Sequence, residues 1–177
     1  MENTRDFPTL ASQRLRLRPF DRADAPAMAM LANDIDVARM TTSIPHPYDL
    51  EQAEAFIAHM ERRDARHQAV FAIETDAAPF IGVIGIQPGP AGPPELGYWL
   101  GRPYWGAGFA TEAACTVTAW AGGRWNKRLL VSGHFADNPA SGQVLCKADF
   151  LYTGEVVSRR SVARGEDAPT RMMVWLA

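Results

Sequence analysis

Apolar and polar residues alternate with a period of two in several short segments, the pattern of β-strands with one buried face. Residues 14–20 (RLRLRPF) place Leu15 and Leu17 on one face and three arginines on the other. Other segments are nearly continuous in apolar residues, as central strands are. We therefore predict seven strands, at residues 14–20, 70–75, 80–87, 95–100, 129–135, 152–160 and 170–176.

Four other segments carry apolar residues at helical spacing. Three of them follow residues that commonly cap helices, namely Asp21, Asp49 with Gln52 three positions later, and Asn138 with Pro139 behind it. The predicted helices cover residues 23–33, 50–60, 109–121 and 139–148. Helices interleaved with strands in this way predict an α+β fold, with the helices packed on the faces of a sheet.

Three segments are expected to lie outside this framework or to play no chemical role. PGPAGPP, at residues 88–94, is expected to be a connection, because proline cannot donate to the hydrogen-bond ladder of a sheet. A polar loop at residues 164–169 is expected to join the last two strands. The arginines of residues 14–20 are expected to form a solvated strand face near Asp21 and Asp24, with a binding role as the alternative.

The strand at residues 95–100 runs into the helix at residues 109–121 through the sequence RPYWGAG. Gly106 and Gly108 permit a bend and a close approach to the backbone, and the unpaired N–H groups of a helix start favour anions such as phosphate. A dinucleotide fingerprint would need a glycine where Thr111 stands, and no Walker lysine follows. A glycine-rich turn without a ligand is the alternative interpretation.

Composition and charge limit the classes of protein to consider. A content of 47% hydrophobic and 21% charged residues is ordinary for a globular protein, and 177 residues suffice for one domain spanning residues 1–177. The formal net charge of −2 gives no reason to expect nucleic acid or a membrane surface as a partner. The N-terminal segment lacks the apolar core of a signal peptide, and no apolar run reaches membrane-spanning length, so the expected location is cytoplasmic.

Cysteine and histidine are too few and too scattered to suggest a metal or redox centre. Cys115 and Cys146 are the only cysteines, and neither has the spacing of metal ligands or of a redox motif. Both fall on predicted helices, where we expect buried thiols and no disulfide. The four histidines also lack ligand spacing, so no metal is expected.

Two motifs carry a family resemblance. ELGYWLGRPYWGAGFATEA, which begins at Glu95, resembles the acetyl-CoA signature of the GNAT N-acetyltransferases, in the branch typified by the ribosomal-protein N-terminal acetyltransferases RimJ and RimL. Its core is a turn of the form Q/R-x-x-G-x-G/A, and Pro103 stands here at the Q/R position. NPASGQVLCKADF, at residues 138–150, is similar to the NxxSxxxLxKxGF pattern that follows the cofactor motif in this RimJ/RimL-like branch. The resemblance extends over residues 10–176.

The resemblance implies the GNAT fold, in which a mixed central sheet of about seven strands is splayed between strands 4 and 5, with about four helices on its faces. It implies acetyl-CoA as cosubstrate and no metal. The pantetheine arm would add to the sheet edge at residues 100–102, and the backbone of residues 105–110 would hold the diphosphate. The implied cofactor-binding residues are Leu100, Gly101, Arg102, Trp105, Gly106, Ala107, Gly108, Phe109, Ala110, Asn138, Ser141 and Lys147.

The chemistry of amine acetylation adds catalytic candidates. An ammonium group has no lone pair, so a base must remove a proton before the nitrogen attacks a thioester. Glu95 is the first candidate, because the family often places its base on this strand, and His134 on the neighbouring strand is the alternative. Where many GNAT enzymes have a tyrosine that protonates the leaving thiolate, this chain has Leu145. The RimL branch implies Ser141 as the substitute, although its hydroxyl could instead bond the backbone of a helix start.

The function implied by the resemblance is transfer of the acetyl group of acetyl-CoA to a primary amine, by direct attack in a ternary complex. The acceptor would be a protein N-terminal α-amine or a small amine such as an aminoglycoside or a polyamine. Family members wall the acceptor site with the first two helices and the loop between them. Candidate substrate contacts are therefore Met40, Ile44, His46 and Tyr48, with packing or exposure without a role as the alternative. Several relatives form homodimers.

A second function of another class stays open. Pro103 and Leu145 depart from the family pattern, and Asp149 stands where the family has a glycine. A left-handed backbone at an aspartate costs about 1 kcal/mol, so the fold tolerates this change. The alternative is accordingly a CoA-binding regulatory or interaction module of the same fold with little or no turnover.

Overall fold

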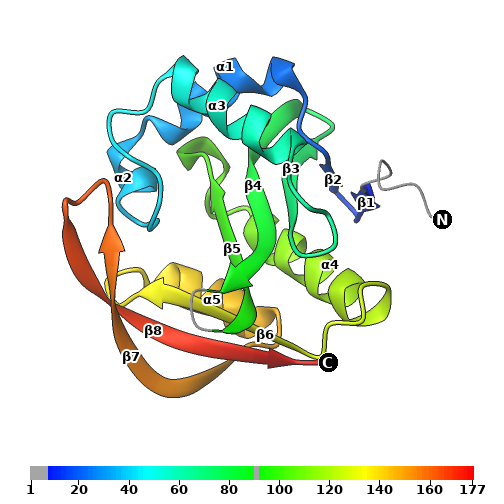
Figure 1. Ribbon diagram of the computed structural model, residues 1–177, viewed down its shortest axis with the longest axis vertical. Coiled ribbons are helices and arrows are strands. Elements are labelled where there is room, and N and C mark those ends of the chain that lie inside the picture. The colour runs from blue at the N-terminus through cyan, green and yellow to red at the C-terminus, as the bar shows by residue number, and fades with distance from the viewer. Residues whose placement is uncertain (1–7, 90–91) are drawn as a thin grey trace.

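The computed structural model describes residues 8–89 and 92–177, and its strands form one mixed sheet (Figure 1). The order across the sheet is β1-β2-β3-β4-β5-β6-β8-β7, and every neighbouring pair of described strands is antiparallel except β5 and β6. The strands are β1 (Leu10–Ala11), β2 (Leu15–Arg18), β3 (Ala69–Thr75), β4 (Ala78–Gly89), β5 (Gly92–Leu100), β6 (Leu129–Phe135), β7 (Leu151–Ser161) and β8 (Glu166–Leu176).

Helices cover both faces of this sheet. Methionine and leucine side chains of α1 and α3 pack with Val70 and Val83 on one face, while alanine and valine side chains of α4 pack with Phe71 and Ile84 on the other, where α5 also lies (Figure 1). The described helices are η1 (Arg22–Asp24), α1 (Ala25–Ala32), α2 (Ile35–Ala38), α3 (Leu50–Glu61), η2 (Arg102–Tyr104), α4 (Phe109–Gly123) and α5 (Pro139–Lys147). None of these helices is long and apolar enough to cross a membrane.

The predicted α+β fold and the predicted helix caps are confirmed. Asp21 accepts the backbone N–H of Ala23 and Asp49 that of Gln52, each within a capping box, and Asn138 accepts the N–H of Ser141. All four predicted helices are present, and the short α2 is an addition. All seven predicted strands are present as well, and β1, only two residues long, is the eighth.

Two predictions about connections are wrong. The segment at residues 88–94 is not a free connection, because β4 continues to Gly89 and pairs there with Gly92 of β5, while residues 90 and 91 lie outside the described residues. Pro88, Pro93 and Pro94 lie near the end of a hairpin ladder, where missing N–H donors are tolerated. The polar loop predicted at residues 164–169 is also shorter, because β8 already begins at Glu166 and its charged residues pair across the hairpin with β7.

Both cysteines lie on helices as predicted, but the expectation of buried thiols is wrong. Cys115 on α4 and Cys146 on α5 are free and exposed. On α4 the residues that face the sheet are Ala113, Ala114 and Val117, so Cys115 points away from the core. The left-handed backbone expected at Asp149 is present, with φ of 65°.

The two strands on either side of the glycine motif diverge, as the resemblance to the GNAT family implies. β5 pairs with β4 from Leu100 to Gly92, yet it pairs with β6 at one position only, Glu95 with Val131. Beyond this position the two strands separate toward their C-terminal ends. The splay predicted between the fourth and fifth strands of the sequence is therefore confirmed.

The expectation that the arginines of β2 form a solvated face is wrong for Arg18. Its side chain is only 12% exposed and forms a bidentate ion pair with the buried Asp24, with distances of 2.8 and 2.9 Å. It also contacts Glu74 of β3. The guanidinium thus joins the start of the first helical segment to the middle of the sheet, a contact that short-range sequence spacing does not reveal.

We predict that Arg18→Ala lowers the free energy of unfolding by about 3–5 kcal/mol, because the carboxylate of Asp24 would be left buried without its partner. Arg22→Ala is the matched control, since Arg22 is 83% exposed and its ion pair with Glu61 lies at the surface. The control should change stability by less than about 0.5 kcal/mol. Urea unfolding followed by circular dichroism measures both values, and equal losses in the two variants would contradict the prediction.

Candidate active site

The divergence of β5 and β6 leaves backbone groups of β5 without strand partners. The Leu96 carbonyl is instead bonded by the buried hydroxyl of Ser132 on β6 at 2.8 Å, and the Leu100 carbonyl accepts the indole N–H of Trp105 at 2.8 Å. Backbone groups of alternate residues point to the same edge of a strand, so the N–H and C=O of Tyr98, between these two residues, face the same gap. Tyr98 is therefore the centre of the open edge.

The backbone groups that could pair with an extended ligand therefore differ from those predicted from the sequence. Gly101, predicted to contact such a ligand, directs its N–H to the Ile81 carbonyl at 2.9 Å on the opposite side of β5. The Leu100 carbonyl is occupied as described, whereas its N–H lies on the edge that faces the gap. The side chain of Arg102 bonds Asp36 of α2 at 3.0 Å, so its predicted contact with a cofactor arm loses support.

The loop at residues 105–108, called the glycine loop below, leaves backbone N–H groups exposed to solvent. Residues 105–108 are exposed, and Gly106 and Gly108 adopt positive φ values of 76° and 81° that favour glycine. Gly108 is the N-cap of α4, and no side chain caps the helix. The first-turn N–H groups of α4, beginning with Phe109 and Ala110, are thus left for solvent or an anion.

Ser141 lies in the first turn of α5 and contacts the open edge of β5. The hydroxyl of Tyr98 is 2.7 Å from Ser141 Oγ and donates to the Ser141 carbonyl at 3.1 Å. Burial raises the pKa of Tyr98 to about 12, with the Ser141 contact acting in the opposite direction, so the phenol is protonated at neutral pH. The Ser141 N–H is bonded by Asn138, and the Ser141 hydroxyl contacts Tyr98 rather than a backbone amide of the helix start.

Glu95 stands where β5 and β6 last pair, and it is not isolated. Arg159 of β7 donates through Nη1 to Glu95 Oε1, and both side chains are about one-fifth exposed. Among the described residues Oε2 makes no hydrogen bond. A Cβ added to Gly97, the next residue on the same face of β5, would meet nothing within 4 Å, so the space beside Glu95 is open.

His134 is buried, and both of its ring nitrogens have partners. Nδ1 lies 2.8 Å from the Phe135 carbonyl, which can only accept, so Nδ1 carries the proton. Nε2 lies 2.9 Å from the hydroxyl of Tyr152 on β7 and accepts from it. The ring is thereby engaged in joining β6 to β7, and the sequence-based suggestion that it acts as a base loses support.

The remaining predicted residues lie farther from the divergence. Lys147 is exposed at the far end of α5, where its carbonyl contacts Cys115. Of the candidate substrate contacts, Ile44 and Tyr48 are buried among α1 and α3, so packing is their role. His46 is exposed, and Met40 lies beside Arg164 of the β7–β8 turn.

Four residues of this region were missed from the sequence. Tyr98, Tyr152 and Arg159 are the partners of Ser141, His134 and Glu95, and Arg14 bonds the glycine loop. These pairs are separated by 43, 18, 64 and 93 positions in the chain, and only the tertiary fold brings them together. No group of three or more metal-ligating side chains occurs within residues 8–89 and 92–177.

Comparison with known proteins gives matches of two kinds. A family model described as "Acetyltransferase (GNAT) domain" matches residues 14–151. A curated relative, "Uncharacterized N-acetyltransferase p20" of Bacillus licheniformis, is 33% identical over 111 residues, which are 59% of this chain and 61% of that protein. The match therefore spans about three-fifths of the relative's length.

Solved structures share the fold over nearly the whole chain. RimJ of Mycobacterium smegmatis, in complex with CoA-disulfide, superposes with a TM-score of 0.83 and 19% identity, covering 97% of this chain and 88% of that one. The spermidine N-acetyltransferase of Vibrio cholerae, in complex with CoA and spermine, gives a TM-score of 0.76 and 15% identity, covering 93% of this chain and 96% of that one. At these identities the likeness concerns the fold.

We predict that Gly142→Ala lowers the free energy of unfolding by about 1–3 kcal/mol. The added Cβ would lie 2.4 Å from the Tyr152 hydroxyl and 2.7 Å from His134 Nε2, so these side chains must shift and their hydrogen bond is strained. Gly123→Ala at the end of α4 is the control, because its Cβ would meet nothing within 4 Å, and it should be neutral or stabilising by up to about 1 kcal/mol. Thermal and urea unfolding measure both; a Gly142→Ala variant as stable as the wild type would show that the pair is dispensable.

Proposed function

The chain belongs to the GNAT acetyltransferase family, and on that premise we propose that it transfers the acetyl group of acetyl-CoA to a primary amine by direct attack in a ternary complex. One observation carries the proposal. A β-strand with an open edge, centred on Tyr98, leads into an exposed loop and an uncapped helix start at Gly108. These are the polar groups that an amide-containing arm and a diphosphate require.

The residues present fit coenzyme A. The N–H and C=O of Tyr98 and the N–H of Leu100 would pair with the two amides of the pantetheine arm, as an added strand does. The backbone of residues 105–110 would hold the diphosphate. When bound, the coenzyme supplies an acetyl group activated as a thioester, and the residues around the β5–β6 divergence would bind and orient it.

Glu95 is our candidate for the base. Arg159 holds one carboxylate oxygen, which fixes the side chain, and leaves Oε2 to take a proton from the acceptor amine directly or through one water. The open space at Gly97 gives an acceptor room to approach on the same face of the strand. His134 is less suitable, because its lone pair is already used by Tyr152.

Ser141 is our candidate for the group that protonates the departing thiolate. Tyr98 is protonated at neutral pH and lies 2.7 Å from the Ser141 hydroxyl, so it can hold that hydroxyl in place. Leu145 is fully buried in the core beside α4, which agrees with a proton donor located elsewhere on α5. The Tyr98–Ser141 pair would then protonate the leaving thiolate, the role of a tyrosine on this helix in many other family members.

The acceptor is proposed only as a primary amine. The similar structures are named RimJ, the type of the branch that the sequence motifs resemble, and spermidine N-acetyltransferase, so both a protein N-terminus and a polyamine belong among the acceptors to test. The segment after α2, where the family places one side of the acceptor site, is held by hydrogen bonds to the last hairpin. Arg164 bonds the Arg39 carbonyl at 2.7 Å and the Ser161 hydroxyl bonds the Thr41 carbonyl at 3.1 Å, which ties the β7–β8 turn to the segment after α2.

A CoA-binding module without turnover is the second candidate. The observation in its favour is the ion pair of Glu95, because a carboxylate engaged by Arg159 is a constrained base. This candidate predicts coenzyme binding without acetyl transfer. The two functions therefore differ in one measurable respect, the release of free thiol in the presence of an amine.

We expect acetyl-CoA to lose its acetyl group at a rate that depends on an added amine. The measurement is thiol release across a panel of peptides with free α-amines, spermidine, an aminoglycoside and a small apolar amine, with product mass determined by mass spectrometry. Binding of CoA by calorimetry without thiol release above background for any amine would favour the module. Absence of CoA binding altogether would contradict both candidates.

We predict that Glu95→Gln and Ser141→Ala each lower turnover by about 100-fold or more, because each removes a proton-transfer group, while the dissociation constant for CoA stays within about twofold. Glu54→Gln, on the exposed face of α3, is the control for a removed charge and should leave turnover unchanged. Steady-state kinetics with the best acceptor give the rates. An unchanged rate in either variant removes that residue from the mechanism.

A further inference from the structure

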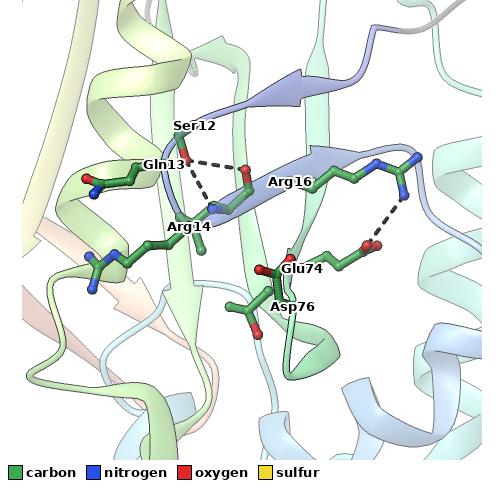
Figure 2. A pocket seen from close by; sticks show the side chains of 8 residues that line it. Ser12, Gln13, Arg14, Arg16, Glu74 and Asp76 are labelled. Carbon is green, nitrogen blue, oxygen red and sulfur yellow. Dashed lines mark hydrogen bonds and ion pairs between the residues drawn. The ribbon is translucent and has the colours of Figure 1, made fainter.

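Arg14, the residue just before β2, contacts the glycine loop and the first turn of α4 at several points. Its Nη1 donates to the Ala107 carbonyl at 2.9 Å, and its Nε donates to Glu112 Oε2 at 2.7 Å. Its guanidinium lies over the Phe109 ring, 4.6 Å from the centroid. Figure 2 shows the side chains of Arg14 and Arg16 extending in opposite directions from β2, with Arg16 bonded to Glu74.

The loop that Arg14 contacts is held at its start by Trp105, whose indole bonds the Leu100 carbonyl, while residues 106–108 make few packing contacts. Residues 105–108 are exposed, and a Cβ added to Gly106 would meet nothing within 4 Å, so packing does not fix the backbone there. Two glycines also give the loop more conformational freedom than other residues would. The hydrogen bond from the Arg14 guanidinium to the Ala107 carbonyl, between the two glycines, therefore favours one conformation of the loop.

Arg14 also neutralises the negative charge of Glu112, which would otherwise repel a phosphate. Glu112 lies in the first turn of α4, and its carboxylate accepts from Arg14 Nε, from the Arg14 backbone N–H at 2.7 Å and from Ser12 Oγ at 2.8 Å. Burial raises the pKa of Glu112, but the hydrogen bonds from Ser12 and Arg14 outweigh it and lower the pKa. The carboxylate is thus ionised at neutral pH, and the guanidinium beside it balances its charge.

We infer that Arg14 is a positioning residue for coenzyme binding, which holds the glycine loop in the shape that receives a diphosphate and screens that diphosphate from Glu112. The inference rests on the proposed function, since it concerns the same coenzyme. It assigns to β2 a role in the site that lies beyond both sequence motifs. Because Arg14 acts through the loop, it should affect ligands with a diphosphate and spare those without one.

The test compares Arg14→Ala with Arg16→Ala, a matched removal of an arginine two positions farther along the chain, within β2. We expect Arg14→Ala to raise the dissociation constant for CoA, measured by calorimetry, by about tenfold, which corresponds to about 1.4 kcal/mol. The KM for acetyl-CoA should rise by a similar factor with kcat within about twofold. Arg16→Ala should leave both quantities unchanged.

Two further measurements separate positioning from general damage. With acetyl-pantetheine, a donor without a diphosphate, the kcat/KM of Arg14→Ala should equal that of the wild type. Arg14→Lys, which keeps the charge but loses the fork that reaches both Ala107 and Glu112, should show an intermediate loss with CoA, and it serves in place of the alanine variant should that one not fold.

The inference is overturned by wild-type affinity for CoA in Arg14→Ala, by an equal loss in Arg16→Ala, or by an equal loss with acetyl-pantetheine. These results are distinct from a failure of the proposed function. In that case the wild-type chain itself would bind no CoA, or would bind it without acetylating any amine.

Discussion

The structure depends on one constraint, the pairing of β5 with β6 at a single position. Buried backbone groups need hydrogen-bond partners, and a sheet that opens in its middle leaves such groups along one edge. Here Ser132 and Trp105 satisfy the Leu96 and Leu100 carbonyls. The edge left between them, at Tyr98, keeps its backbone N–H and C=O without a strand partner, and it is there that the proposed coenzyme arm would pair.

The same constraint explains why the neighbouring side chains come in pairs from distant parts of the chain. Tyr98 reaches Ser141 on α5, and Arg159 on the last hairpin reaches Glu95. The Arg159–Glu95 pair bridges the two halves of the sheet across the divergence, where backbone hydrogen bonds between strands are missing, and the Tyr98–Ser141 pair joins β5 to α5. Polar side chains thus replace part of the lost ladder and at the same time place hydroxyl and carboxylate groups beside the gap.

Local signals in the sequence were sufficient for most of the fold. The strand at residues 129–135 and the caps at Asp49 and Asn138 were found because periodicity and capping chemistry act over a few residues. The proline segment at residues 88–94 was misread because its hairpin depends on pairing between two strands, and the thiol of Cys115 because helix orientation depends on packing. Arg14, Tyr98 and Arg159 gave no local signal, since the identity of a side chain does not reveal a partner tens of residues away.

The three departures from the family pattern bear on the choice between an enzyme and an inactive module. Pro103 lies in the first turn of η2, where its missing N–H costs nothing. Asp149 adopts the left-handed backbone that a glycine would, and Leu145 fills the core beside α4. Each substitution is therefore accommodated by the fold at its own position, with no sign of an obstructed site. The departures are compatible with the proposal that the proton donor lies at a position other than Leu145. They do not support the alternative of a module without turnover.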